Sequence, residues 1–161
     1  MKFKKRICPP GLFGAILLIV LALSGCGLIG NGSSGGSDLE VQKRIWKNYS
    51  TGSYSFTLTR SCFCMYAGEF EITVRLNQIV EIVPPSWWTQ GPIPQEDYQY
   101  FQTVDDLFTT LENAYRDGAD SLQVEYADDG YPTDVTIDYW KQAVDDEIFY
   151  SVRNLVMSDA L

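Results

Sequence analysis

Cys62 and Cys64 are the residues of this sequence with the most specific potential chemistry. In a regular strand, Cα atoms two residues apart are separated by about 6.6 Å, near the upper limit for a disulfide. A bond between these cysteines therefore requires a bulge or a turn at Phe63. Three interpretations remain open: a structural disulfide, a pair of free or buried thiols, and a redox catalyst. The redox interpretation has the least support, because reactive thiolates usually lie at a helix N-terminus and this pair is predicted on strand residues.

Acidic residues suggest a second kind of site. Residues 117–147 contain ten carboxylates and one lysine, with Asp128 and Asp129 in a predicted turn and Asp145 and Asp146 near the last predicted strand. Calcium binds oxygen ligands grouped on loops, so these four aspartates are weak calcium candidates. Their spacing matches no EF-hand loop. The alternative is that they cap turns and form a solvated surface.

Aromatic residues are concentrated in a proline-rich connection. Residues 84–102 contain four prolines together with Trp87, Trp88 and three further aromatic residues, without a clear period. A connection of this length is usually a functional loop, a lid or a disordered segment. The two tryptophans could form an exposed surface for a partner protein, a glycan or the membrane interface. Alternatively, they could fold back as a lid over an open face of the sheet.

The motifs of common enzyme classes are missing. The sequence has no histidine, which removes the commonest general base and the usual zinc ligand. It also contains no phosphate-binding glycine loop. The Gly-x-Ser-x-Gly pattern occurs only at residues 32–36 and the Gly-x-Gly-x-x-Gly pattern only at residues 25–30 and 30–35, at the lipobox and in the predicted tether. No predicted strand precedes them there, so they form neither a nucleophile elbow nor a dinucleotide fingerprint. Carboxylate pairs for glycoside hydrolysis remain possible, since such pairs are assembled in space. We therefore expect no metal and no cofactor, and we expect that the protein is not an enzyme.

The first 25 residues have the pattern of a lipoprotein signal peptide. Four basic residues precede an apolar run at residues 12–23, which is too short for a membrane-spanning helix. The run ends in Leu23-Ser24-Gly25-Cys26, which resembles the bacterial lipobox. This pattern predicts cleavage before Cys26 and acylation of its sulfur. The alternative is an uncleaved anchor helix that leaves Cys26 as an ordinary thiol.

Processing at this site changes the charge and the cysteine content. It leaves eight of the twelve basic residues and all twenty-one acidic ones, so the formal net charge changes from −9 to −13. Nucleic acid and anionic lipid head groups are therefore unfavourable partners for the folded part of the protein. Cys8 is removed and Cys26 carries lipid, which leaves Cys62 and Cys64 as the cysteines that can pair outside the cytoplasm.

Alternating apolar residues predict a mostly antiparallel sheet. Residues 54 to about 64, 69–76 and 79–83 fit a three-stranded meander, with a reversal at residues 66–68 and a two-residue turn at Asn77-Gln78. Residues 122–126 and 135–139 fit a hairpin. The last segment fits either a strand or a helix, and its Ile, Phe, Tyr and Val content favours a strand. We expect the even-numbered residues of 54–58 and 70–76 to face the core.

Two helices are predicted, and one is strongly indicated. Residues 27–37 are rich in Gly and Ser and should form a flexible tether, after which Asp38 can cap a first helix that ends near residues 48–52. Thr103 and Asp106 form a capping pair for the second helix, and Gly118 ends it. The apolar face of this second helix, which includes Leu107, should cover one face of the sheet.

Several segments in a characteristic order also suggest a family. They are Trp46, Tyr54-Ser55-Phe56, Arg60-Ser61-Cys62-Phe63-Cys64, Thr103-Val104-Asp105-Asp106-Leu107-Phe108, Val124-Glu125-Tyr126, Gly130-Tyr131-Pro132-Thr133, Ile137-Asp138 and Asp145-Asp146-Glu147. Together they resemble a family of bacterial envelope lipoproteins known as domain of unknown function 6174. The resemblance implies a secreted α+β domain whose last segment is a strand, with no assigned activity and no catalytic residues. The sequence departs from the family pattern at Asn77-Gln78, where an acidic residue and glycine are usual.

These observations predict a signal peptide at residues 1–25, a lipidated tether at residues 26–37 and one α+β domain at residues 38–161. The domain should contain five to six strands, with one or two helices packed on one face. The expected function is that of a lipid-anchored envelope protein that binds a partner or has a structural role, facing the periplasm or the cell surface. The alternatives are a thiol-disulfide protein that uses Cys62 and Cys64, and a calcium-binding protein.

Overall fold

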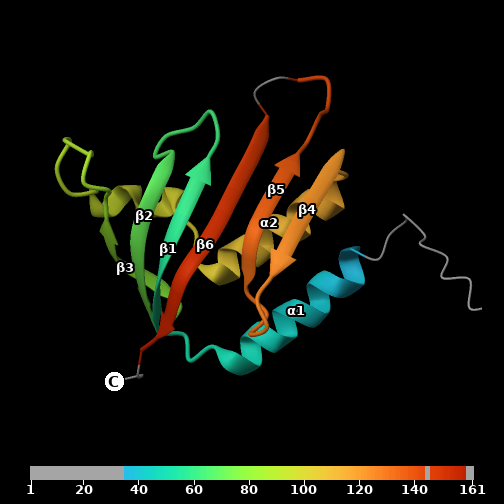
Figure 1. The fold of residues 1–161 in the computed structure, drawn as a ribbon, viewed down its shortest axis with the longest axis horizontal. Helices are drawn as coiled ribbons and strands as arrows, with labels where there is room; N and C mark the ends of the chain where they lie inside the picture. Colours follow the sequence, from blue (N-terminus) through green and yellow to red (C-terminus); the bar gives the residue numbers. More distant parts are fainter. Residues whose placement is uncertain (1–34, 144–145, 159–161) are drawn as a thin grey trace, which may run out of the picture. The chain divides into compact units, whose positions relative to one another are not determined.

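The computed structural model describes residues 35–143 and 146–158. The predicted signal peptide, Cys26 and most of the predicted tether lie outside these residues. The described chain forms a six-stranded sheet, two α-helices and one short 3-10 helix (Figure 1). In chain order, the elements are α1 (Gly35–Tyr49), β1 (Tyr54–Ser61), β2 (Gly68–Arg75), β3 (Gln78–Val83), η1 (Gln95–Tyr100), α2 (Val104–Asp117), β4 (Ser121–Tyr126), β5 (Pro132–Asp138) and β6 (Glu147–Met157).

The sheet is antiparallel throughout, with the strand order β3-β2-β1-β6-β5-β4. The predicted meander is β1–β3 and the predicted hairpin is β4–β5. The last segment of the chain is a strand, as its composition favours, and it lies between β1 and β5. It therefore joins the meander and the hairpin into one sheet.

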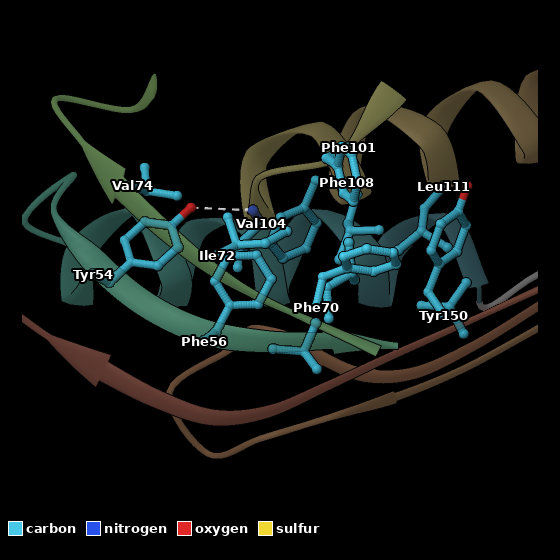
Figure 2. Packing of buried hydrophobic residues seen from close by; sticks show 14 of the residues in the cluster. Tyr54, Phe56, Phe70, Ile72, Val74, Phe101, Val104, Phe108, Leu111 and Tyr150 are labelled. Atoms are coloured by element: carbon cyan, nitrogen blue, oxygen red, sulfur yellow. Dashed lines mark hydrogen bonds between the residues drawn. The ribbon is translucent and has the colours of Figure 1, made fainter. Parts of the chain in front are cut away.

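Both helices cover the same face of this sheet, and the core lies between. β1 buries Tyr54, Phe56 and Leu58, and β2 buries Phe70, Ile72 and Val74, as the alternation predicts. Figure 2 shows Tyr54, Phe56, Phe70 and Ile72 directed towards residues of α2. The buried residues of α2 are Val104, Leu107, Phe108, Leu111 and Ala114. The alternate residues of the strands and the apolar face of α2 thus form one hydrophobic core.

The predicted turn at Asn77-Gln78 is shifted by one residue. Leu76 and Asn77 form the turn, with φ angles of 50° and 62°, and Gln78 is already paired with Arg75 in the ladder. A two-residue hairpin turn with positive φ at both positions matches the twist of the flanking strands. As a result Leu76 is 76% exposed, although the alternation predicts it in the core.

Helix α2 begins and ends where the sequence predicts. The Thr103 hydroxyl accepts a hydrogen bond from the Asp106 N–H at 3.1 Å, and the Asp106 carboxylate accepts one from the Thr103 N–H at 3.0 Å. This capping box satisfies two backbone donors. Gly118 ends the helix in the left-handed conformation, with φ 75°. The Val104 N–H donates a hydrogen bond to the hydroxyl oxygen of Tyr54 at 3.1 Å, which connects β1 to the first turn of α2 (Figure 2).

Helix α1 begins earlier than predicted. It includes Gly35, so Asp38 lies in its first turn and does not cap it, and the predicted tether is helical from Gly35 onwards. Near its other end, Trp46 is fully buried, with its ring centroid 5.2 Å from that of Tyr54 and 6.0 Å from that of Tyr131. The buried Trp46 thus anchors the second half of α1 on the core. Within the described residues, no helix is long and apolar enough to span a membrane.

Candidate functional site

Three connections meet at the same end of the sheet. The register pairs Ser61 with Phe149 and Asp138 with Glu147, so the β1–β2 and β5–β6 connections leave the sheet at one end. The connection from β3 to η1 leaves there too, because β3 runs antiparallel to β2. Figure 1 shows these connections along the top of the sheet. We call this the loop end.

The two cysteines lie in the β1–β2 connection, residues 62–67, which we call the disulfide loop. Strand β1 ends at Ser61, so the prediction that the strand continues to Cys64 was wrong. The chain turns at Cys62–Cys64, and the two cysteines form a disulfide with a Cα–Cα distance of 5.2 Å. The turn brings the two Cα atoms closer together than they would be in a regular strand. A disulfide between cysteines two residues apart requires such a turn or bulge.

The disulfide loop exposes large apolar side chains. Phe63, between the two cysteines, is 92% exposed, and Met65 is 61% exposed. Cys62 and Cys64 themselves are half-buried. A three-residue ring holds Phe63 away from the core and in solvent. Exposed apolar residues of this size are typical of interaction sites when they gather in one place.

Arg60 places a positive charge beside the disulfide. Its Nε donates a hydrogen bond to Cys62 Sγ at 3.3 Å, and its Nη1 donates another to the carbonyl oxygen of Tyr100. The guanidinium group is thus held between the disulfide loop and η1. Burial raises the pKa of the neighbouring Tyr150 hydroxyl, and the charge of Arg60 partly offsets this. The sequence contained a signal for Arg60, since it precedes Cys62 by two residues at the end of a strand, but we assigned it no role.

An open hollow of about 260 Å³ lies next to the disulfide. Its described lining is Ser61, Cys62, Phe63, Thr136, Glu147, Ile148 and Phe149. Cys62 belongs to this lining, whereas Cys64 is not part of its described residues. These lining residues include two aromatic residues, one acidic residue and one cysteine. It arises because β6 lies between β1 and β5, which the sequence pattern did not reveal.

The two tryptophans of the β3–η1 connection have different environments. Trp88 is half-buried: its ring centroid is 5.8 Å from that of Tyr66 and 6.1 Å from that of Phe70. Trp87 is 61% exposed and lies against Gly68, where an added Cβ would be 3.1 Å from its ring. Trp88 therefore packs on the core as a lid would, while Trp87 remains available at the loop end.

Tyr66 connects the disulfide loop to η1. Its hydroxyl donates a hydrogen bond to the carboxylate of Asp97, and this bond, together with burial, raises the pKa of Tyr66 to about 12. Its ring centroid is 5.2 Å from that of Phe101, which is buried. The base of the disulfide loop is therefore fixed, although Phe63 at its tip is exposed.

The three calcium candidates within the described residues are not brought together. Asp128 and Asp129 lie in the turn before β5, whereas Asp146 is the last residue of the connection between β5 and β6. Seven residues of β-strand separate the two groups by about 20 Å. Asp145 is outside the described residues. Within the part of the chain that the structure describes, no group of three or more metal-binding side chains was found.

A larger hollow of about 520 Å³ lies beside the start of α2. Several of its polar groups already have partners within the protein. The carboxylate of Asp106 belongs to the capping box, and the hydroxyls of Thr109 and Thr110 donate to carbonyl groups one turn earlier in the helix. Because these groups are occupied, the loop end is the stronger candidate site.

Comparisons with known proteins identify a family but assign no activity. No curated protein and no solved structure matches the chain. One family model matches, over residues 38–157, and its description is "Family of unknown function (DUF6174)". The match covers α1 from Asp38 onwards and continues to the end of β6. The chain therefore belongs to this family of unknown function.

Proposed function

We propose that this protein is a lipid-anchored component of the bacterial cell envelope whose loop end binds a protein partner without catalysing a reaction. The observation that supports binding most directly is the exposure of Phe63, at 92%, on a loop whose base is fixed by packing. Hydrophobic surface exposed on a rigid support is a common feature of interaction sites. Met65 and Trp87 expose further apolar surface at the same end.

The proposed anchor rests on the sequence before the domain. A cationic start, a short apolar run and Leu23-Ser24-Gly25-Cys26 together favour acylation at Cys26. Gly27 follows in place of the aspartate that retains lipoproteins in the inner membrane of enteric bacteria, so the outer membrane is the proposed location where the cell has one. The acidic charge of the processed chain disfavours nucleic acid as a partner.

The anchor can be tested by metabolic labelling. Cells that produce the full-length protein are grown with labelled palmitate, and the purified protein is analysed by mass spectrometry. We expect label on wild-type protein and none on Cys26→Ser. An unlabelled wild-type protein with a free thiol at this position would exclude the anchor.

Partner binding can be tested by site-specific photocrosslinking in cells. A photoreactive residue is introduced at Phe63 in one variant and at Leu76 in a control variant. Leu76 has similar exposure, at 76%, but lies in the turn at the opposite end of β2. We expect a discrete crosslinked product from position 63. Wild-type protein without the photoreactive residue, produced in excess as a competitor, should reduce the amount of this product. Phe63→Ser protein used as the competitor should not reduce it. Equal crosslinking from both positions would contradict a specific site at the loop end.

A further inference from the structure

We infer that the Cys62–Cys64 disulfide is an exchangeable redox site, in which Cys62 bonds to a cysteine of a partner protein and Arg60 stabilises the released Cys62 thiolate. This goes beyond the proposed partner binding, and it does not depend on lipid at Cys26. It rests on three observations: the size of the disulfide ring, the contact between Arg60 and Cys62, and the hollow beside Cys62.

The disulfide constrains very little of the chain. It joins residues with a sequence separation of two. Stabilisation by a disulfide comes mainly from the entropy that the closed loop removes from the unfolded chain, and it falls as the loop becomes shorter. The base of the disulfide loop is held independently, by Tyr66 against Phe101 and by its hydrogen bond to Asp97. The bond can therefore open and close while the fold is kept.

Arg60 makes the two sulfurs inequivalent. Its Nε is 3.3 Å from Cys62 Sγ, and its other contact, to the carbonyl oxygen of Tyr100, holds the guanidinium in place. A fixed positive charge beside a sulfur favours the thiolate over the thiol, and the thiolate is both the nucleophile and the leaving group in exchange. No equivalent contact is described for Cys64. In the reduced protein, Cys62 should therefore be the more reactive thiol.

The hollow gives a partner access to Cys62, the cysteine that Arg60 contacts. Cys62 lies in its lining next to Phe63 and Phe149, which offer apolar contact, and Glu147 adds a carboxylate. The hollow is open, so it suits a cysteine on an extended protein segment. Because Glu147 and the overall charge are negative, a segment with neutral or basic residues beside its cysteine fits better than an acidic one.

The exchange is a two-electron reaction that needs a partner with two thiols. A partner thiolate attacks Cys62 Sγ, which forms a mixed disulfide and releases Cys64 as a thiolate that takes up a proton. The second partner thiolate then attacks the partner's sulfur in the mixed disulfide and releases the Cys62 thiolate beside Arg60. The partner dithiol is oxidised to a disulfide and Cys62–Cys64 is reduced to a dithiol. The reverse sequence reduces a partner disulfide.

The first test measures which thiol reacts. Full-length protein in detergent is reduced with dithiothreitol, freed of the reagent and treated with limiting iodoacetamide at neutral pH, and the modified peptides are quantified by mass spectrometry. We expect Cys62 to be alkylated at least tenfold more than Cys64. The preference should fall below threefold in Arg60→Met and remain in the matched control Arg75→Met, which changes an exposed arginine at the other end of β2.

The second test measures exchange itself. Oxidised protein is mixed with a reduced synthetic peptide that carries two cysteines and basic neighbours, and one peptide disulfide should form for each protein molecule reduced. Cys64→Ser, in which Cys62 keeps a free thiol, is mixed with the disulfide form of the same peptide. The Cys62 thiolate attacks this disulfide, forms a mixed disulfide and releases the second peptide thiol. This mixed disulfide should accumulate on Cys64→Ser, whereas Cys62→Ser should form little of it. Equal alkylation of the two thiols, an unchanged preference in Arg60→Met, or oxidised protein that does not exchange with the peptide would each overturn the inference. None of these results bears on palmitate at Cys26 or on crosslinking from position 63.

Discussion

Substitution of Gly130 by alanine tests whether the β4–β5 turn supports α1. Gly130 is buried in this turn and has a φ angle of 87°, a conformation that costs a residue with a Cβ about 1–2 kcal/mol. An added Cβ would also lie 2.6 Å from the carbonyl oxygen of Gln42 and 2.7 Å from the nitrogen of Trp46, both backbone atoms of α1. The helix would have to move, since ordinary contact requires more than 3.4 Å.

The cost can be separated into two parts with a matched control. Gly118 has a similar φ angle of 75°, but an added Cβ there meets nothing within 4 Å. Gly118→Ala should therefore lower the free energy of unfolding by the conformational cost alone, about 1–2 kcal/mol. Overpacking adds about 1–3 kcal/mol. We expect Gly130→Ala to cost about 2–5 kcal/mol in total, because the burial of Trp46 against Tyr54 and Tyr131 depends on the same contact.

Urea unfolding of both variants and the wild type, followed by tryptophan fluorescence, measures this difference. Fluorescence is suitable because Trp46 is fully buried in α1. The reasoning predicts a larger loss for Gly130→Ala by at least about 1 kcal/mol, and a red shift of the native emission if α1 is displaced. Equal losses in the two variants, with unchanged native emission, would refute a close approach of the turn to the helix.

Four further predictions concern the core, the helix start, the disulfide loop and the buried tyrosines. Tyr54→Phe leaves the buried Val104 N–H without its acceptor and should cost about 1–3 kcal/mol in urea unfolding. Thr103→Ala removes the capping box and should cost about 1–2 kcal/mol, which thermal unfolding followed by circular dichroism can measure. Reduction of the disulfide loop should cost only about 1.6 kcal/mol, because a ring of three residues removes little chain entropy, and a loss above about 4 kcal/mol would contradict this. Stability should also fall at alkaline pH. Burial raises the pKa of Tyr54 and raises that of Tyr126 to about 12, so both side chains must be neutral in the folded state. Their contribution is complete below pH 10 and is lost as the pH rises above it, and a free energy of unfolding that stays constant from pH 9 to pH 12 would contradict the assignment.

Many residues that carry the family resemblance have structural roles. Trp46 packs against Tyr54 and Tyr131, and Gly130 allows the turn to approach α1. These residues stabilise the fold of this chain. The Cys-Phe-Cys run differs, because the structure gives the exposed Phe63 no packing role. It is therefore the part of the pattern that packing does not explain, and it coincides with the candidate site.

Local sequence patterns were sufficient to predict most of the individual strands and helices. Alternation of apolar residues defined β1, β2 and the β4–β5 hairpin, and the pair Thr103 and Asp106 together with Gly118 defined the ends of α2. These features are local, because backbone conformation and the burial of one face of a strand or helix depend on neighbouring residues. The condition that Cys62 and Cys64 need a turn in order to pair followed from strand geometry alone.

The way in which these elements form a site depends on contacts between distant parts of the chain. The position of β6 between β1 and β5 brings Phe149 and Glu147 to Cys62, and η1 supplies the carbonyl group that holds Arg60. The fold also places the described aspartates of the calcium hypothesis at opposite ends of β5. Contacts between residues this far apart in the sequence depend on which arrangement buries the most apolar surface and satisfies the backbone of the whole sheet, and no local pattern contains that information.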